Sequence, residues 1–162
     1  MINGDWSSDV CSSDLGFKSY AAEFKDTSKH WAKTYIEEAV KYGFVSGYTD
    51  GTFKPDNPIT RAEFTKMLNS AIGNTAETDI NFPDVKSGKW YYNDVQKGVA
   101  AGFISGKSNG DFAPDAKITR QETAVMLSRI VPTSGSNATL KVYSDYKNVE
   151  YWAETVDRKS VV

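Results

Sequence analysis

The sequence has little of the chemistry that disulfides and metal sites require. Among its 162 residues there is one cysteine, Cys11, and one histidine, His30. A single cysteine cannot form a disulfide within the chain, and a single histidine cannot build a histidine-rich metal site. We therefore expect a protein that folds without disulfides and binds neither a metal nor a cofactor.

An excess of one charge and long apolar runs are also missing. Lys and Arg number 19 and Asp and Glu number 21, which gives a formal net charge of −2. This balance predicts no nucleic-acid partner. No apolar run approaches the roughly 20 residues that a membrane helix needs, so no membrane partner is expected either. The remaining composition, 40% hydrophobic with 13% aromatic residues, is typical of a globular domain.

Two terminal segments look foreign to the rest of the chain. Residues 4–15, "GDWSSDVCSSDL", resemble a common sequencing adapter translated in frame, and residues 157–162, "DRKSVV", resemble the start of the partner adapter. Neither segment has apolar periodicity. We interpret residues 1–15 and 157–162 as adapter-derived and expect the sequence between them to be a fragment, with a natural polar tail as the alternative.

An internal repeat organises the sequence between these ends. "GFVSGYTDGTFKPDNPITRAEFTKML" (43–68) aligns without gaps with "GFISGKSNGDFAPDAKITRQETAVML" (102–127). Upstream, "FKDTSKHWA" (24–32) matches "FPDVKSGKWY" (82–91), and a third start appears at "YSDYKNVEYWA" (143–153). The predicted segments are a first unit at 24–73, a linker at 74–81, a second unit at 82–131, a linker at 132–142 and a truncated third unit at 143–156.

Each unit reads as a helix, a turn-rich loop and a second helix. The first helix of unit one carries apolar residues at helical spacing and ends before Gly43, which suits a left-handed cap. Its predicted apolar positions are Trp31, Tyr35, Ile36, Ala39 and Val40. The second helix has a predicted buried stripe of Phe64, Met67, Leu68, Ala71 and Ile72. Two helices and a loop cannot bury a core alone, so we predict an all-α fold of tandem helix-loop-helix repeats packed against one another.

A capping box marks the start of the second helix in both units. Thr60 with Glu63, and Thr119 with Glu122, give the T-x-x-E pattern in which side chains and backbone N–H groups at a helix start satisfy each other. The glutamates could suggest catalytic acids, but capping already explains them. We interpret these four residues as structural.

The repeated pattern F-x-D…W…G-x-F-x-P…I-T-R-x-E resembles the S-layer homology domain, over residues 24–131 and the start at 143–156. The resemblance implies modules in threes that pack as a pseudo-three-fold spindle with grooves between neighbouring units. It further implies a secreted, non-catalytic anchor at the cell wall or S-layer that binds a secondary wall polysaccharide carrying acidic pyruvate ketals. The alternatives are a self-assembling S-layer structural protein, or the anchor fragment of a wall-active glycan hydrolase whose catalytic domain is missing.

Arg61 and Arg120 occupy an unusual place, the first turn of the second helix. A cation there faces the positive end of the helix dipole, at a cost of roughly 0.3–1 kcal/mol. The placement is sensible if an anion is to arrive, because N–H groups at a helix start and a guanidinium both suit a carboxylate. We predict contact with the ketal carboxylate. The alternative is a salt bridge to an acid of the next unit, with Asp84 or Asp145 as the partner.

Aromatic and small residues complete the predicted site. A tryptophan at a helix start is more often a core residue, although the resemblance would let it also form a groove wall that stacks on sugar. Loop serines and glycines suit sugar hydroxyls and close backbone approach, or ordinary turns. The predicted glycan-binding residues are Arg61, Arg120, Trp31, Trp90, Trp152, Asp84, Asp145, Ser46, Gly47, Ser105 and Gly106. Because the third unit is cut, an apolar face should stay exposed, and self-association through that truncated unit is expected.

Overall fold

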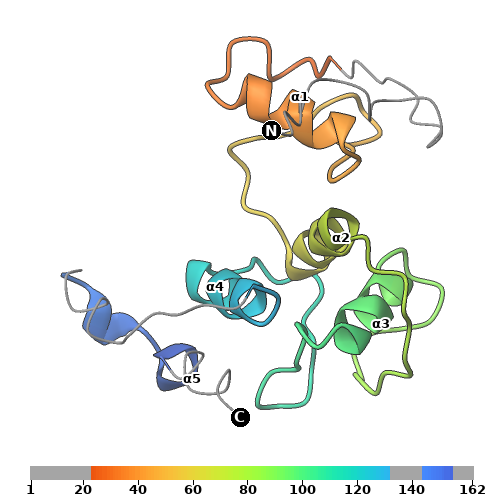
Figure 1. Ribbon diagram of the computed structural model, residues 1–162, viewed down its shortest axis with the longest axis vertical. Helices are drawn as coiled ribbons and strands as arrows, with labels where there is room; N and C mark the ends of the chain where they lie inside the picture. The colour runs from red at the N-terminus through yellow and green to blue at the C-terminus, as the bar shows by residue number, and fades with distance from the viewer. Residues whose placement is uncertain (1–22, 132–143, 155–162) are drawn as a thin grey trace, which may run out of the picture.

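The computed structural model describes residues 23–131 and 144–154, and all regular structure within these ranges is helical (Figure 1). The helices are α1 (Lys33–Lys41), α2 (Arg61–Ile72), α3 (Tyr92–Ala100), α4 (Arg120–Ser128), the 3-10 turn η2 (Tyr146–Asn148) and α5 (Tyr151–Glu154). The all-α prediction is confirmed. The segments interpreted as adapter-derived, 1–15 and 157–162, and the linker at 132–142 lie outside the described residues.

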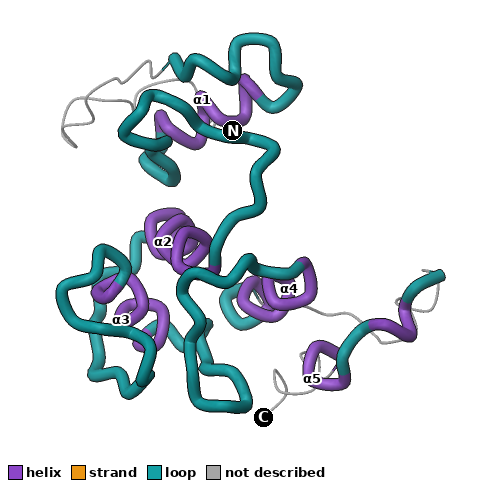
Figure 2. The backbone as a smooth tube through the Cα atoms, turned by 180° about the vertical axis from the view of Figure 1, so that it is seen from behind, coloured by secondary structure: helices purple, strands orange, loops and turns teal. Residues whose placement is uncertain are grey.

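Helices pair across the boundary between units rather than within a unit. α2, the second helix of unit one, packs against α3, the first helix of unit two, and α4 packs in the same way against α5 (Figure 2). α1 lies apart from this α2–α3 pair (Figure 1). The units therefore bury their surfaces against their neighbours, as a repeat protein must. The closed pseudo-three-fold spindle stays an expectation.

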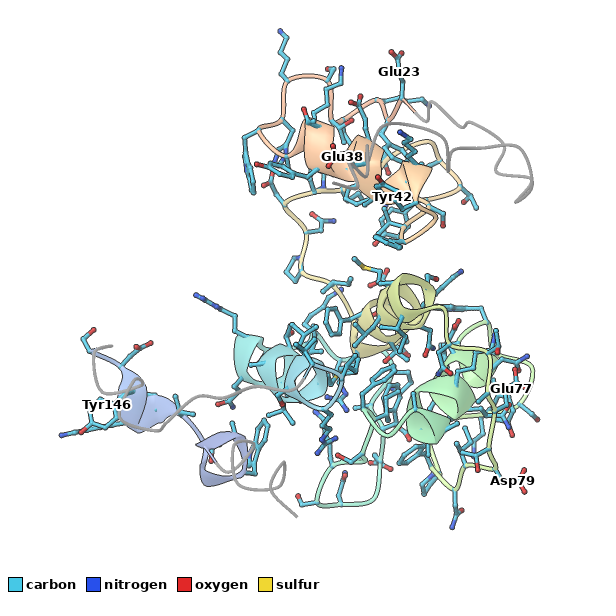
Figure 3. All side chains as sticks on the ribbon, in the orientation of Figure 1. Glu23, Glu38, Tyr42, Glu77, Asp79 and Tyr146 are labelled. Carbon is cyan, nitrogen blue, oxygen red and sulfur yellow. The ribbon has the colours of Figure 1, made fainter. Side chains whose placement is uncertain are left out.

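The hydrophobic core gathers where α2, α3 and α4 meet, and side chains fill the space between these helices (Figure 3). Its largest fully buried side chains are Phe103 and Phe112, which come from the loop of unit two, and Val95 from α3. In α1 only Ile36 is buried. The described core is thus built mainly from unit two and the α2 helix that it receives from unit one.

The buried faces of both helices of unit one differ from the predicted ones. In α2 the buried residues are Arg61, Ala62, Thr65, Leu68 and Asn69. Of the predicted stripe only Leu68 is buried, and Ile72 is 40% exposed. The N-terminal end of α2 contacts the loop of unit two. As a result, the face of α2 that is buried includes polar residues of the helix. Tyr35 of α1 is 68% exposed, and Trp31, two residues before α1, is 81% exposed.

Both predicted capping boxes are present. The Thr60 hydroxyl accepts from the Glu63 N–H at 3.2 Å, and the Glu63 carboxylate accepts from the Thr60 N–H at 2.8 Å. The same pair of bonds joins Thr119 and Glu122, at 3.2 and 2.9 Å. The predicted cap of the first helix is present as well. Gly43, which follows the C-terminal end of α1, has a φ of 73°, the left-handed geometry expected of a residue that ends a helix.

Candidate functional site

Two grooves lie at equivalent places on the two units. We call the first the Ser46 groove; it has a volume of about 680 Å³ and lies between the loop of unit one, α2 and Trp90 of unit two. The second, the Ser105 groove, has a volume of about 460 Å³ and lies between the loop of unit two, α4 and Trp152 of α5, in the segment predicted to begin a third unit. Each groove therefore joins the loop and second helix of one unit to the tryptophan of the next. Both have the size expected of small-ligand sites.

Arg61 is buried and holds unit one against unit two. Its Nε donates to the Phe112 carbonyl at 2.8 Å, and its Nη1 donates to Glu122 Oε1 at 3.0 Å. The guanidinium also lies 5.0 Å from the centre of the Phe112 ring. Burial lowers the pKa of Arg61, and the nearby carboxylates of Glu122 and Asp84 partly offset this effect.

The predicted salt bridge between units is therefore present, but its acidic partner is not one of the two predicted aspartates. Glu122, and not Asp84 or Asp145, pairs with Arg61. The cation at this helix start is stabilised by a carboxylate of the next unit, which offsets the unfavourable dipole. Arg61 also lines the Ser105 groove, so contact between Arg61 and a glycan stays a prediction.

Arg120 occupies the same position of unit two in a different environment. It is exposed, and its side chain forms no hydrogen bond or ion pair within residues 23–131 and 144–154. The difference has a structural cause: unit two presents Glu122 to Arg61, whereas no carboxylate within the described residues pairs with Arg120. Arg120 lines neither groove, whereas Arg61 lines the Ser105 groove with its Nε and Nη1 already engaged in hydrogen bonds.

The three tryptophans of the predicted site are not core residues. Trp31, Trp90 and Trp152 are 81%, 56% and 46% exposed, so the core interpretation is wrong. Trp90 and Trp152 form walls of the two grooves, where an exposed indole face can meet a ligand. Trp31 lines neither groove. Each of these two tryptophans faces the loop of the preceding unit. The sequence pattern of a single unit does not show this contact between units, and so it suggested that the tryptophan is buried.

The loop residues meet the protein's own aromatic rings. Ser46 and Ser105 are exposed in their grooves. A Cβ on Gly106 would lie 2.8 Å from the Phe82 ring, and one on Gly47 would collide with the Phe24 ring. Glycine at these positions is thus required by the packing of each loop on the phenylalanine of the F-x-D segment.

The aspartates of the F-x-D segments fix these loops. Asp84 accepts from the N–H groups of Phe112 and Ala113 at 2.9 and 2.6 Å. Asp26, absent from the predicted site, accepts equivalently from Phe53 and Lys54 at 2.9 and 2.7 Å. Ala113 and Lys54 have positive φ values of 58° and 56°, so each carboxylate stabilises a turn that non-glycine residues adopt reluctantly. The side chain of Asp145 is exposed and makes no hydrogen bond among the described residues.

Sequence reasoning missed the basic residues of the grooves. Arg129 and Lys107 line the Ser105 groove, whereas Lys54 and Lys66 line the Ser46 groove. A signal was available for Arg129, because it follows Glu122 by two helical turns and so lies on the same face of α4. In the described residues there is no cluster of three potential metal ligands and no helix of membrane-spanning length and apolarity.

The repeat geometry agrees with a comparison against known families. The profile of the S-layer homology domain matches residues 23–65 and 81–124. The chain belongs to the S-layer homology domain family. Each match contains one F-x-D segment, one groove loop and one I-T-R-x-E helix start, which are the parts that build the two S-layer homology grooves.

Relatives with this S-layer homology segment carry very different names. A surface-layer 125 kDa protein of Lysinibacillus sphaericus is 34% identical over 83% of this chain and 12% of that protein. An endoglucanase of Bacillus sp. strain KSM-635 is 33% identical over 90% of the chain and 16% of that protein. A cellulosome-anchoring protein of Acetivibrio thermocellus is 32% identical over 84% of the chain and 32% of that protein.

The shared segment is a small part of each of these relatives, since the chain spans at most about a third of their length. The endoglucanase matches through this segment only, so its name is no evidence of catalysis by this chain. The chain is therefore a cell-surface anchoring module of the S-layer homology type.

Proposed function

We propose that the chain anchors its parent protein by binding an acidic, pyruvylated cell-wall polysaccharide through the grooves between its repeats. The observation that supports this most directly is the equivalent construction of the two grooves. In each, a serine of the loop, basic side chains and an exposed tryptophan of the next unit face one space. Hydroxyls, cations and an aromatic face are the groups that bind a sugar ring carrying a carboxylate.

Arg120 lines neither groove and adds to this proposal a separate contact outside them. Its side chain is exposed, and the N–H groups of Arg120 and Gln121 at the start of α4 have no partner among the described residues. A guanidinium and free N–H groups at a helix start both favour a carboxylate. Arg61, in contrast, supports the site by joining the units. The two arginines of the repeated motif therefore have different parts in the same function.

A pull-down with purified cell walls tests the proposal. Walls are compared before and after mild acid removal of the ketal, with the intact chain and with Arg120→Gln. We expect binding to fall several-fold on ketal removal and in the variant, while Lys86→Gln, at an exposed lysine away from both grooves, binds as the wild type does. Equal binding to both wall preparations would contradict recognition of the carboxylate. Release of soluble sugar from the walls would instead support a glycan hydrolase.

Self-association is a second candidate function, and a specific contact favours it. The N–H groups of Arg61 and Ala62 donate to the carbonyls of Ala116 and Pro114 at 2.9 and 3.0 Å. One repeat later, the N–H groups of Arg120 and Gln121 have no such acceptors within the described residues.

The matching surface of unit one is open as well. Its carbonyls at Pro55 and Asn57, equivalent to Pro114 and Ala116, accept no hydrogen bond within the described residues. Among the described residues, the N–H donors of Arg120 and Gln121 and the carbonyl acceptors of Pro55 and Asn57 are thus left without a backbone partner. A second copy of this chain carries the complement of both, and association of copies is the S-layer structural role.

A further inference from the structure

The two grooves hold their charges differently, although their backbones follow the same plan. The floor of each contains a capping glutamate: Glu63 in the Ser46 groove and Glu122 in the Ser105 groove. Glu122 is neutralised by Arg61 at 3.0 Å and has the Lys107 Nζ 3.9 Å away. Glu63 has no arginine partner among the described residues and accepts instead from the neutral Tyr48 hydroxyl at 2.8 Å.

The basic groups of the Ser46 groove lie over aromatic rings. The Lys54 Nζ is 4.4 Å from the centre of the Tyr48 ring, and the Lys66 Nζ is 5.8 Å from the centre of the Trp90 ring. Lys54 also pairs with Asp50 at 3.5 Å. The charge of Lys117 also acts on Glu63. The Ser46 groove is thus lined by two lysines and one glutamate, whereas three basic side chains, Arg61, Lys107 and Arg129, and one glutamate line the Ser105 groove. The smaller excess of positive charge makes the Ser46 groove better suited to an uncharged sugar face.

Arg129 makes the Ser105 groove different. Its Nη1 donates to the Ser105 hydroxyl at 3.0 Å and to the Phe103 carbonyl at 3.2 Å. These bonds hold the guanidinium beside the loop, and its other N–H groups have no partner among the described residues. A guanidinium held in place on one side can bind a carboxylate on the other with little loss of side-chain freedom. Unit one has Ser70 at the equivalent position and Tyr48 in place of Lys107.

We propose that the Ser105 groove is the anion-selective groove, in which Arg129 and Lys107 bind the acidic substituent of the glycan, while the Ser46 groove takes an uncharged part of the polymer. This inference rests on the proposed function and assigns the acid recognition to one of the two grooves. Its basis is the juxtaposition of Arg129, Lys107 and a glutamate already neutralised by Arg61. The position equivalent to Arg129 in unit one carries no charge, which supplies matched variants.

The test measures binding of the full chain to soluble wall polysaccharide, native and stripped of its ketals, by titration calorimetry. Arg129→Ser and Lys107→Tyr give the second groove the residues of the first. Each should weaken binding to the native polymer about tenfold, the value of a charge-assisted hydrogen bond of roughly 1.5 kcal/mol, and leave binding to the stripped polymer unchanged. The control is Lys86→Gln, which removes the charge of an exposed lysine that lines neither groove and should leave binding to both polymers unchanged.

Three results would overturn the assignment. If the wild type binds both polymers equally, the proposed function and this inference fail together. If the wild type discriminates but Arg129→Ser and Lys107→Tyr discriminate as well as it does, only the groove assignment fails. If Arg129→Ser weakens binding to both polymers alike while Lys107→Tyr has no effect, Arg129 positions the loop and does not bind the acid. A far-UV thermal melt of each variant shows whether its fold is intact.

Discussion

Thr65 is a polar residue in an apolar place, at the middle of α2. Its side chain is fully buried, and its hydroxyl has no hydrogen-bond partner in the part of the chain that the structure describes. An unsatisfied buried hydroxyl costs about 1 kcal/mol or more, and valine has the same shape without it. We therefore expect Thr65→Val to raise the free energy of unfolding by about 1 kcal/mol in urea denaturation. Thr75→Val, at an exposed threonine, is the control, and equal stability of wild type and Thr65→Val would contradict the prediction.

Substitutions of Arg61 and Arg120 should differ in their effect on the free energy of unfolding, although both residues belong to the same repeated motif. Arg61→Gln removes the buried partner of Glu122 and the bond to the Phe112 carbonyl, so it should destabilise the fold by about 3 kcal/mol. Arg120→Gln alters an exposed side chain and should change stability by less than about 0.5 kcal/mol. The denaturant midpoints of the two variants check this. Equal losses would show that the inter-unit salt bridge does not stabilise the protein.

At the scale of elements, the helix starts of α2 and α4 make the fold sensitive to acid. Burial of Glu122 acts to raise its pKa, but hydrogen bonds from the Thr119 N–H and hydroxyl and the charge of Arg61 lower it by more. Glu63 has a lowered pKa for similar reasons, with Thr60 and Tyr48 as donors. A carboxylate whose pKa is lower in the folded state stabilises the protein above its unfolded pKa, about 4.3, and loses that contribution as the pH falls through the folded value.

We therefore expect stability to be level from neutral pH down to about pH 5 and to decline below it, as followed by thermal melts. Glu122→Gln should be less stable at pH 7 and should show a shallower decline in acid. Glu38→Gln, on an exposed face of α1, serves as the charge-matched control. An unchanged acid slope in Glu122→Gln would mean that other groups govern the response.

These elements also show how far the sequence alone could reach. The capping boxes and the glycine after α1 are local patterns, in which residues within four positions satisfy one another, so they were predictable. The partner of Arg61 lies 61 residues away and depends on how units dock, which periodicity does not encode. The buried face of α2 was misjudged for the same reason: Asn69 is buried because it donates to the Asp94 carbonyl of α3 at 2.8 Å.

The sequence predicted where the candidate site lies but not all of the residues that form it. The repeated serine-glycine loops pointed to both grooves, because repetition marks equivalent surfaces. The exposed tryptophans and Arg129 become meaningful only when the next unit is in place, since each groove wall comes from a neighbour. A single unit therefore predicts its own helices well and its binding surface poorly.

For the whole molecule, the Arg61–Glu122 contact predicts how copies of the chain meet. The same contact one repeat further on would place Arg120 of one copy against Glu63 of another, so we expect association that depends on concentration in sedimentation velocity experiments. Arg120→Glu should abolish it by placing two acids together, whereas Lys86→Glu, with the same change of charge, should not. The Glu63→Arg variant alone is not conclusive, because it also removes a helix cap. The decisive measurement is therefore a mixture of the two single variants, Arg120→Glu and Glu63→Arg. This mixture restores a pair of opposite charges between copies and should associate again. A monomer at every concentration in the wild type, or no recovery in the mixture, would contradict this mode of contact.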